Sequence, residues 1–86
     1  MVEETFFKKK NCDLYLLLAT ERSLKNAAKK VNLSYRYALF LVKRWMNKEF
    51  IAKEPRQEMR YVYTSKGLEM RMVIEDLNRA LGEMKW

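Results

Sequence analysis

Residues 32–34 constrain the fold of this chain more than any other segment, because they leave room only for a tight turn between two predicted helices. Apolar side chains recur at helical spacing on both sides of this segment. Ser23 and Ser34 are favourable N-caps for helices that begin just after them, and Asn32 suits the left-handed backbone position that ends a helix. Two helices joined by so short a turn must cross at a steep angle.

The apolar residues on each side of the turn predict which helix faces are buried. In the first helix, which begins after Ser23, the apolar face carries Leu24, Ala27, Ala28 and Val31. In the second, from Tyr35 to about Glu49, the buried stripe carries Ala38, Leu41, Val42 and Trp45. The opposite face of the second helix is left outside, and it carries Arg36, Phe40, Lys43 and Asn47.

A further helix is predicted upstream of this pair, over about Cys12 to Thr20, where Leu14, Leu17 and Leu18 form an apolar stripe. Asn11 or Asp13 is expected to cap its start. The preceding segment, residues 5–10, places two aromatic residues beside three lysines. It is open to three interpretations: an extra helical turn, a dimer-packing arm or a basic tail.

Downstream, the spacing of apolar residues changes toward the period of a β-strand. Residues 50–54 and 60–64 are β-branched or aromatic runs that predict a hairpin, with a charged tip over 55–59. Tyr61 and Tyr63 share one face of the second strand and are expected to lie against the helices. The fold class is therefore α+β and mainly α, with one domain over residues 1–86.

A long final helix follows, capped by Thr64 or Ser65 and running from about Lys66 to Met84. Its apolar residues repeat at close to heptad spacing. A helix of this length cannot bury its whole stripe against so small a body, so we expect a second copy of the chain to cover it. The expected dimer residues are Met70, Val73, Ile74, Leu77, Leu81 and Met84.

The positive charge is concentrated in the middle of the chain. The net charge of +7 divides into −1 over residues 1–21, +8 over 22–60 and zero over 61–86. No acidic residue lies between Glu21 and Glu49. A solvated surface ordinarily mixes both signs, whereas a segment of one sign favours a polyanionic partner.

Composition excludes several kinds of chemistry. The chain has no histidine, one cysteine and two glycines, so the usual zinc sites, histidine-based catalysis and glycine-rich phosphate loops cannot be assembled within one chain. We expect no enzyme, no cofactor and no metal. Cys12 is expected to be a small buried residue, with a bridge between two chains left open. The apolar runs are too short for a membrane span, so we expect an intracellular, cytoplasmic protein with no membrane partner.

The segment Ser23–Trp45 resembles the helix-turn-helix of winged-helix transcription regulators, particularly compact archaeal proteins of the MarR and PadR kind. The match lies in Ala28, Val31, Leu33, Ala38 and Leu41, which have the spacing of the small and apolar residues in those proteins. Residues 50–54 look like the strand that opens the wing, and residues 61–68 look like the junction that closes it. The resemblance covers about residues 11–84. Two residues depart from it, because Asn32 and Glu49 stand where those proteins often have glycine.

The resemblance implies a homodimeric, sequence-specific regulator that binds double-stranded DNA. It implies a three-helix core over 11–49 with the helix-turn-helix at 23–48, a wing over 50–64 and a dimer helix over 65–84. The third helix would enter the major groove, and the residues implied for it are Ser34, Tyr35, Arg36, Tyr37, Phe40, Lys43 and Arg44. The implied phosphate contacts are Ser23, Lys25 and Lys29, and the implied wing contacts are Lys53, Arg56 and Arg60.

Several alternatives stay open at this stage. Arg36 suits a guanine or a phosphate, Tyr35 and Tyr37 suit DNA or the neighbouring helices, and Phe40 suits a thymine methyl group, the core or a dimer surface. A nonspecific chromatin or nucleic-acid-associated protein would share the basic surface. A winged-helix protein-interaction module would instead use Leu39 and Phe40 as part of a partner groove. The short chain leaves no effector domain, so we expect no small-molecule effector.

Overall fold

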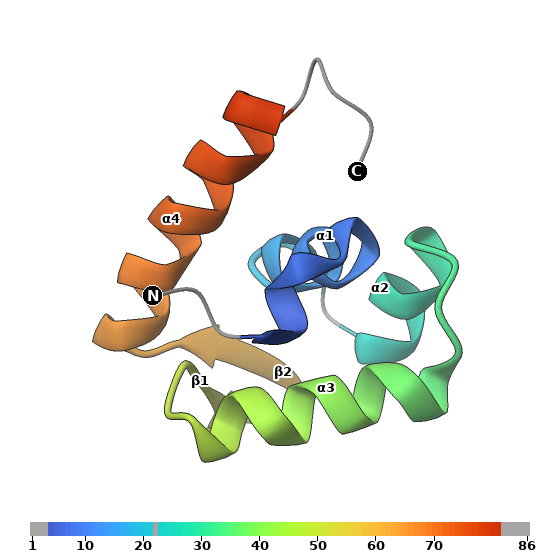
Figure 1. Cartoon of the computed structure of the whole chain (residues 1–86). Coiled ribbons are helices and arrows are strands. Elements are labelled where there is room, and N and C mark those ends of the chain that lie inside the picture. Colours follow the sequence, from blue (N-terminus) through green and yellow to red (C-terminus); the bar gives the residue numbers. More distant parts are fainter. Residues whose placement is uncertain (1–3, 22, 82–86) are drawn as a thin grey trace.

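A computed structural model describes residues 4–21 and 23–81 of the chain. Over these residues the protein is small, α+β and mainly helical, with four α-helices and a two-stranded antiparallel sheet. This confirms the expected fold class at that level. None of the described helices combines the length and apolar composition needed to cross a membrane. In chain order the elements are a 3₁₀ turn (Glu4–Phe7), α1 (Lys9–Leu17), α2 (Leu24–Lys30), α3 (Tyr35–Asn47), β1 (Ile51–Glu54), β2 (Gln57–Tyr63) and α4 (Ser65–Leu81) (Figure 1).

An aromatic cluster at the centre of the core joins the N-terminal segment to α1 and α3. Phe6 stacks on Trp45 with 5.2 Å between ring centroids, and Tyr15 meets both rings edge-on at 5.0 and 5.2 Å. All three side chains are fully buried. Residues 5–10 therefore contain a 3₁₀ turn and the start of α1, as in the first of the three interpretations, and Phe6 is part of the chain's own core.

The prediction for the first helix is wrong at both ends, since α1 covers Lys9–Leu17 rather than about 12–20. Neither expected residue caps it; Lys8 holds the cap position and its side chain makes no capping bond. Asn11 lies inside α1 and is buried, and its side-chain amide donates to the Thr5 carbonyl at 2.8 Å and to the Tyr37 hydroxyl at 3.3 Å. These tertiary hydrogen bonds replace the local cap that the sequence suggested.

The turn between α2 and α3 has the predicted construction. The Ser23 hydroxyl accepts the Asn26 amide at 3.4 Å, and the Ser34 hydroxyl accepts the Tyr37 amide at 3.1 Å. Asn32 has a φ of 59°, and the amide of Leu33 returns to the Ala28 carbonyl at 2.9 Å. This pair of features is a Schellman ending, which satisfies the last carbonyls of α2 and turns the chain directly into α3.

The C-terminal end of α3 repeats this construction with a less suitable residue. Glu49 has a φ of 66°, and the Phe50 amide donates to the Trp45 carbonyl at 2.9 Å. Phe50 is buried, with its ring centroid 6.2 Å from that of Phe6, so the turn directs the chain through the core into β1. Glu49 thus adopts a left-handed backbone conformation, which glycine favours, at the position where the winged-helix regulators that this sequence resembles often have glycine.

The hairpin has a tighter tip than predicted. Strand β2 begins at Gln57, and Glu54 pairs with Gln57, so the turn holds Pro55 and Arg56 rather than five residues. The register is irregular after Lys53, which pairs with Tyr61. Tyr61 is buried and Tyr63 packs against the core, which confirms the expected inward face of β2.

The start of α4 is fixed tightly against the rest of the protein. Thr64 is the cap, since its hydroxyl accepts the Gly67 amide at 3.0 Å. The Tyr15 hydroxyl donates to the Gly67 carbonyl at 2.6 Å. A Cβ atom on Gly67 would lie 1.7 Å from the Phe50 carbonyl oxygen, so this position has no space for a side chain.

Candidate nucleic-acid interface

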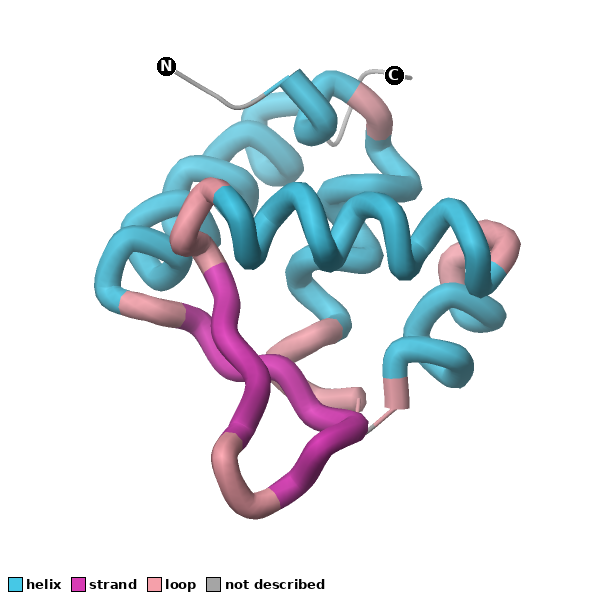
Figure 2. The backbone as a smooth tube through the Cα atoms, turned by 90° about the horizontal axis from the view of Figure 1, so that it is seen from below, coloured by secondary structure: helices cyan, strands magenta, loops and turns pink. Residues whose placement is uncertain are grey.

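The outward face of α3 carries the four residues predicted from its periodicity. Arg36, Phe40, Lys43 and Asn47 are all exposed, whereas the opposite stripe of α3 is fully buried in the core. Figure 2 shows α3 nearest the viewer, with α2 beside its N-terminal end and the β1–β2 hairpin projecting beside it. The sequence therefore predicted correctly which side of α3 is exposed.

Further exposed cations lie on α2, the helix that packs directly on α3. Lys25 and Lys29 are exposed, and neither they nor Arg36 and Lys43 form an ion pair with any residue in the described ranges 4–21 and 23–81. Lys30 differs, because its amino group lies 3.0 Å from the Glu21 carboxylate. We call Lys25, Lys29, Arg36 and Lys43 the α2–α3 cation group; their charges are not compensated within the described part of the chain.

The aromatic residues of α3 divide between this face and the interior. Tyr35 is 46% exposed and Phe40 is 54% exposed, so Phe40 is not a core residue. Tyr37 is half-buried; its ring stacks on Phe40 with centroids 6.0 Å apart, and its hydroxyl accepts the hydrogen bond from Asn11. Tyr37 therefore connects the outward face of α3 to the core.

The other predicted contact residues occupy mixed environments. Ser34 is exposed and Ser23 is half-buried, and both hydroxyls accept helix-capping hydrogen bonds. A hydroxyl has a donor in addition to its acceptor positions, so each O–H is still able to donate to a phosphate. Arg44 is half-buried. On the hairpin, Lys53 and Arg56 are exposed and Arg60 is half-buried.

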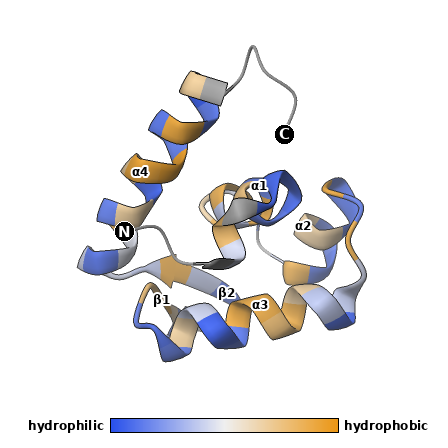
Figure 3. Cartoon of the chain, in the orientation of Figure 1, coloured by the Kyte–Doolittle hydropathy of each residue, from blue (hydrophilic) through white to orange (hydrophobic). Residues whose placement is uncertain are grey.

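The predicted dimer stripe on α4 needs correction. Ile74 is fully buried in the chain's own core and is not available to a second copy. Met70 and Leu77 are half-buried, whereas Val73 is 43% exposed. Leu81 is the last residue of α4, and Met84 lies outside the described residues. Hydrophobic residues recur along the helix (Figure 3), but one side of the predicted stripe faces the body of the protein.

Two exposed apolar residues of α4 were missed in the prediction. Leu68 is 50% exposed and Met72 is 66% exposed, and with Val73 they form what we call the outer α4 face. The spacing of Leu68 and Met72, four residues apart, could have indicated a second apolar face. The prediction followed the heptad pattern on the adjacent side of the helix instead. The basic and acidic residues of α4 are equal in number, so the helix has no net charge. Two ion pairs lie within it, at 2.8 Å between Arg71 and Glu75 and 3.1 Å between Asp76 and Arg79.

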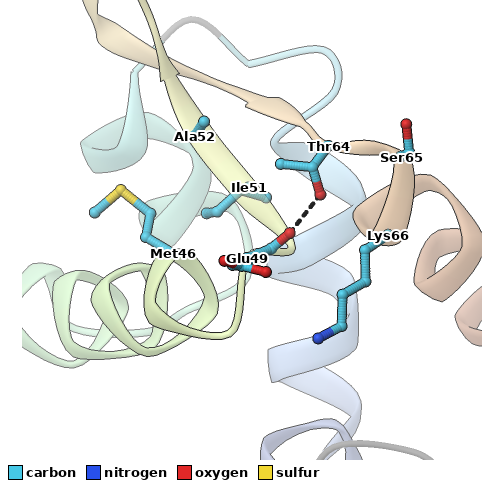
Figure 4. A pocket seen from close by; sticks show the side chains of 7 residues that line it. All are labelled: Met46, Glu49, Ile51, Ala52, Thr64, Ser65 and Lys66. Carbon is cyan, nitrogen blue, oxygen red and sulfur yellow. Dashed lines mark hydrogen bonds between the residues drawn. The ribbon is translucent and has the colours of Figure 1, made fainter.

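An open depression of about 540 Å³ lies between the end of α3, β1 and the start of α4. Figure 4 shows that Thr64 and Glu49 approach each other across it, where the Thr64 hydroxyl donates to the Glu49 carbonyl. The Lys66 amino group lies 5.2 Å from the centroid of the Phe50 ring. The polar groups of this depression thus hold the β1–α4 junction together.

The side chains of Cys12 and Tyr63 are titratable, and each lies against a backbone carbonyl of the protein's own interior. Burial raises the pKa of the Cys12 thiol to about 11, and its Sγ lies 3.0 Å from the Phe6 carbonyl oxygen. Burial likewise raises the pKa of Tyr63 to about 12, and its hydroxyl donates to the Tyr15 carbonyl. Cys12 is fully buried, as expected, and its thiol is therefore closed to a second chain. Within residues 4–21 and 23–81, no cluster of three potential metal ligands occurs.

No protein-family model, curated protein or solved structure matches this chain. The described residues that stand out for a polyanionic partner are the α2–α3 cation group and, on α3, the exposed aromatic residues Tyr35 and Phe40.

Proposed function

We propose that this protein is a sequence-specific regulator that binds double-stranded DNA as a homodimer, through a winged helix-turn-helix formed by α2, α3 and the hairpin. The α2–α3 cation group is the observation that carries the proposal. A partner rich in phosphate compensates such charges, and it releases counterions as it does so. An α-helix also has the diameter to enter the major groove of B-form DNA.

In this proposal the residues have different tasks. Arg36, near the start of α3, donates two hydrogen bonds to a guanine edge, because the guanidinium fork matches its two acceptors. Lys25, Lys29 and Lys43 bind phosphate oxygens, which supply affinity and register. The exposed hairpin cations Lys53 and Arg56 lie along the adjacent backbone or minor groove.

A second copy of the chain is proposed to cover the outer α4 face. Two copies repel each other wherever their basic surfaces meet, whereas α4 is neutral and exposes apolar side chains. Pairing through α4 therefore brings the chains together at little electrostatic cost. Such a dimer would present two α3 helices to half-sites about 34 Å apart on one side of the duplex.

The test begins with selection of bound sequences from a random duplex library at physiological salt. The proposal predicts an enriched, two-fold symmetric site that binds at least about 10³-fold more tightly than random duplex. Arg36→Ala should reduce this ratio. Arg79→Ala is the matched control, because Arg79 is an exposed cation paired with Asp76 on α4 and should leave binding unchanged.

The outcome also separates the rival functions. A ratio near one, with strong binding to every duplex, would support a nonspecific nucleic-acid-associated protein. Intact activity after charge reversal at Arg36 and Lys43 would contradict DNA binding by this face and support a protein-interaction module.

A further inference from the structure

We propose that the stacked Tyr37–Phe40 pair is a preformed contact for the 5-methyl group of thymine, and that Asn11 is the positioning residue that fixes it. This inference rests on the proposed function and names a base that the surface reads. The Phe40 ring is 54% exposed, and it lies nearly parallel to the Tyr37 ring, with 21° between the two planes.

The core holds the pair in place. Asn11 is 2% exposed, and its amide uses both hydrogens, one toward the Thr5 carbonyl at 2.8 Å and one toward the Tyr37 hydroxyl at 3.3 Å. The Tyr37 ring is thereby anchored at its hydroxyl, and Phe40 stacks on an anchored ring. An apolar contact that is ordered before binding loses less conformational entropy when it binds.

The neighbours of Phe40 determine which apolar group fits. Arg36 lies one turn before it and Lys43 one turn after it on the same exposed face. An apolar protein surface would remove water from these cations without compensating them, whereas DNA brings phosphates and guanine acceptors to them. On the base edges of the major groove, the thymine methyl is the apolar group, and the other positions require hydrogen bonds that a phenyl ring cannot make.

The experiment replaces thymine by uracil at each position of the selected duplex, which removes the methyl group and leaves the hydrogen-bonding edge intact. We expect wild-type protein to lose about fourfold in affinity at one or two positions of each half-site, the value of one buried methyl group. Phe40→Ala should bind the thymine and uracil duplexes equally. Lys43→Ala is the control, because it should weaken binding to both duplexes by the same factor.

The role of Asn11 is tested through Tyr37→Phe, which keeps the ring and removes the anchored hydroxyl. We expect the thymine-to-uracil affinity ratio to fall toward one, with the salt dependence of binding unchanged. An unchanged ratio would overturn the positioning role.

The remaining outcomes separate this inference from the proposed function. Specific duplex binding with no thymine-to-uracil difference at any position would overturn the methyl contact and leave the proposed function standing. Tighter binding to single strands than to duplex would also overturn it, since the rings would then stack on unpaired bases. A protein that binds no duplex would overturn both.

Discussion

Replacing Gly67 by alanine tests how closely the start of α4 packs on the rest of the protein. The new Cβ would lie 1.7 Å from the Phe50 carbonyl oxygen, so the two backbones must separate by more than about 1.5 Å to reach an ordinary contact. Overpacking of this kind costs about 1–3 kcal/mol. The movement also disturbs two hydrogen bonds, Tyr15 to Gly67 at 2.6 Å and Thr64 to Phe50 at 3.0 Å, each worth about 1 kcal/mol.

Helix propensity acts in the opposite direction, because alanine is favoured over glycine inside a helix by about 0.5–1 kcal/mol. We therefore expect Gly67→Ala to lower the free energy of unfolding by about 3 kcal/mol, which lowers the Tm by more than about 10 °C in a domain of this size. Urea unfolding followed by circular dichroism measures this change. Asp76→Ala is the control on α4, since it removes only an exposed ion pair with Arg79, and its expected change is within about 0.5 kcal/mol. A stabilised Gly67→Ala protein would refute the close approach.

Three further predictions address other features of the fold. Glu49→Gly should raise the free energy of unfolding by about 1 kcal/mol, since φ is 66° there; a loss in urea unfolding would contradict this. The free energy of unfolding should fall as the pH rises above about 9, because burial raises the pKa of Cys12 to about 11 and that of Tyr63 to about 12. The unfolded chain releases these two protons at lower pH than the folded protein does. Urea unfolding between pH 8 and 11 measures this fall, and a flat profile would argue against it. Met72→Glu should convert the proposed dimer into a monomer in analytical ultracentrifugation, whereas Asp76→Ala should leave the dimer intact. Equal behaviour of the two variants would exclude the outer α4 face as the dimer contact.

The α2–α3 unit was predictable because its signals are local. Ser23 and Ser34 each accept the backbone amide three residues further along the chain, and Asn32 itself adopts the left-handed backbone conformation, so these signals are visible in the local sequence. The buried stripe of α3 followed from periodicity alone, and so did its exposed face, with Arg36 and Phe40. The candidate site depends largely on this unit, so most of its residues could be placed from the sequence.

The errors arose where distant contacts decide the structure. Asn11 looks like a local cap, but its amide is used by Thr5 and by Tyr37, which lies 26 residues away. On α4, periodicity identified a helix with apolar residues, but which of these residues the other helices and the hairpin cover depends on how α4 packs. That packing buries Ile74 and leaves Leu68 exposed. No sequence pattern supplies that geometry.

The salt dependence of duplex binding tests the central claim most directly, using the selected site and the triple variant of Lys25, Lys29 and Lys43 to alanine. If these lysines and the exposed hairpin cations each neutralise one phosphate in both copies, log Kd against log salt has a slope of magnitude up to about 9. The triple variant should lower that magnitude by about 5, since six phosphate contacts are lost per dimer. A flat titration of the wild-type protein, or the same slope in the triple variant, would contradict DNA binding by this face.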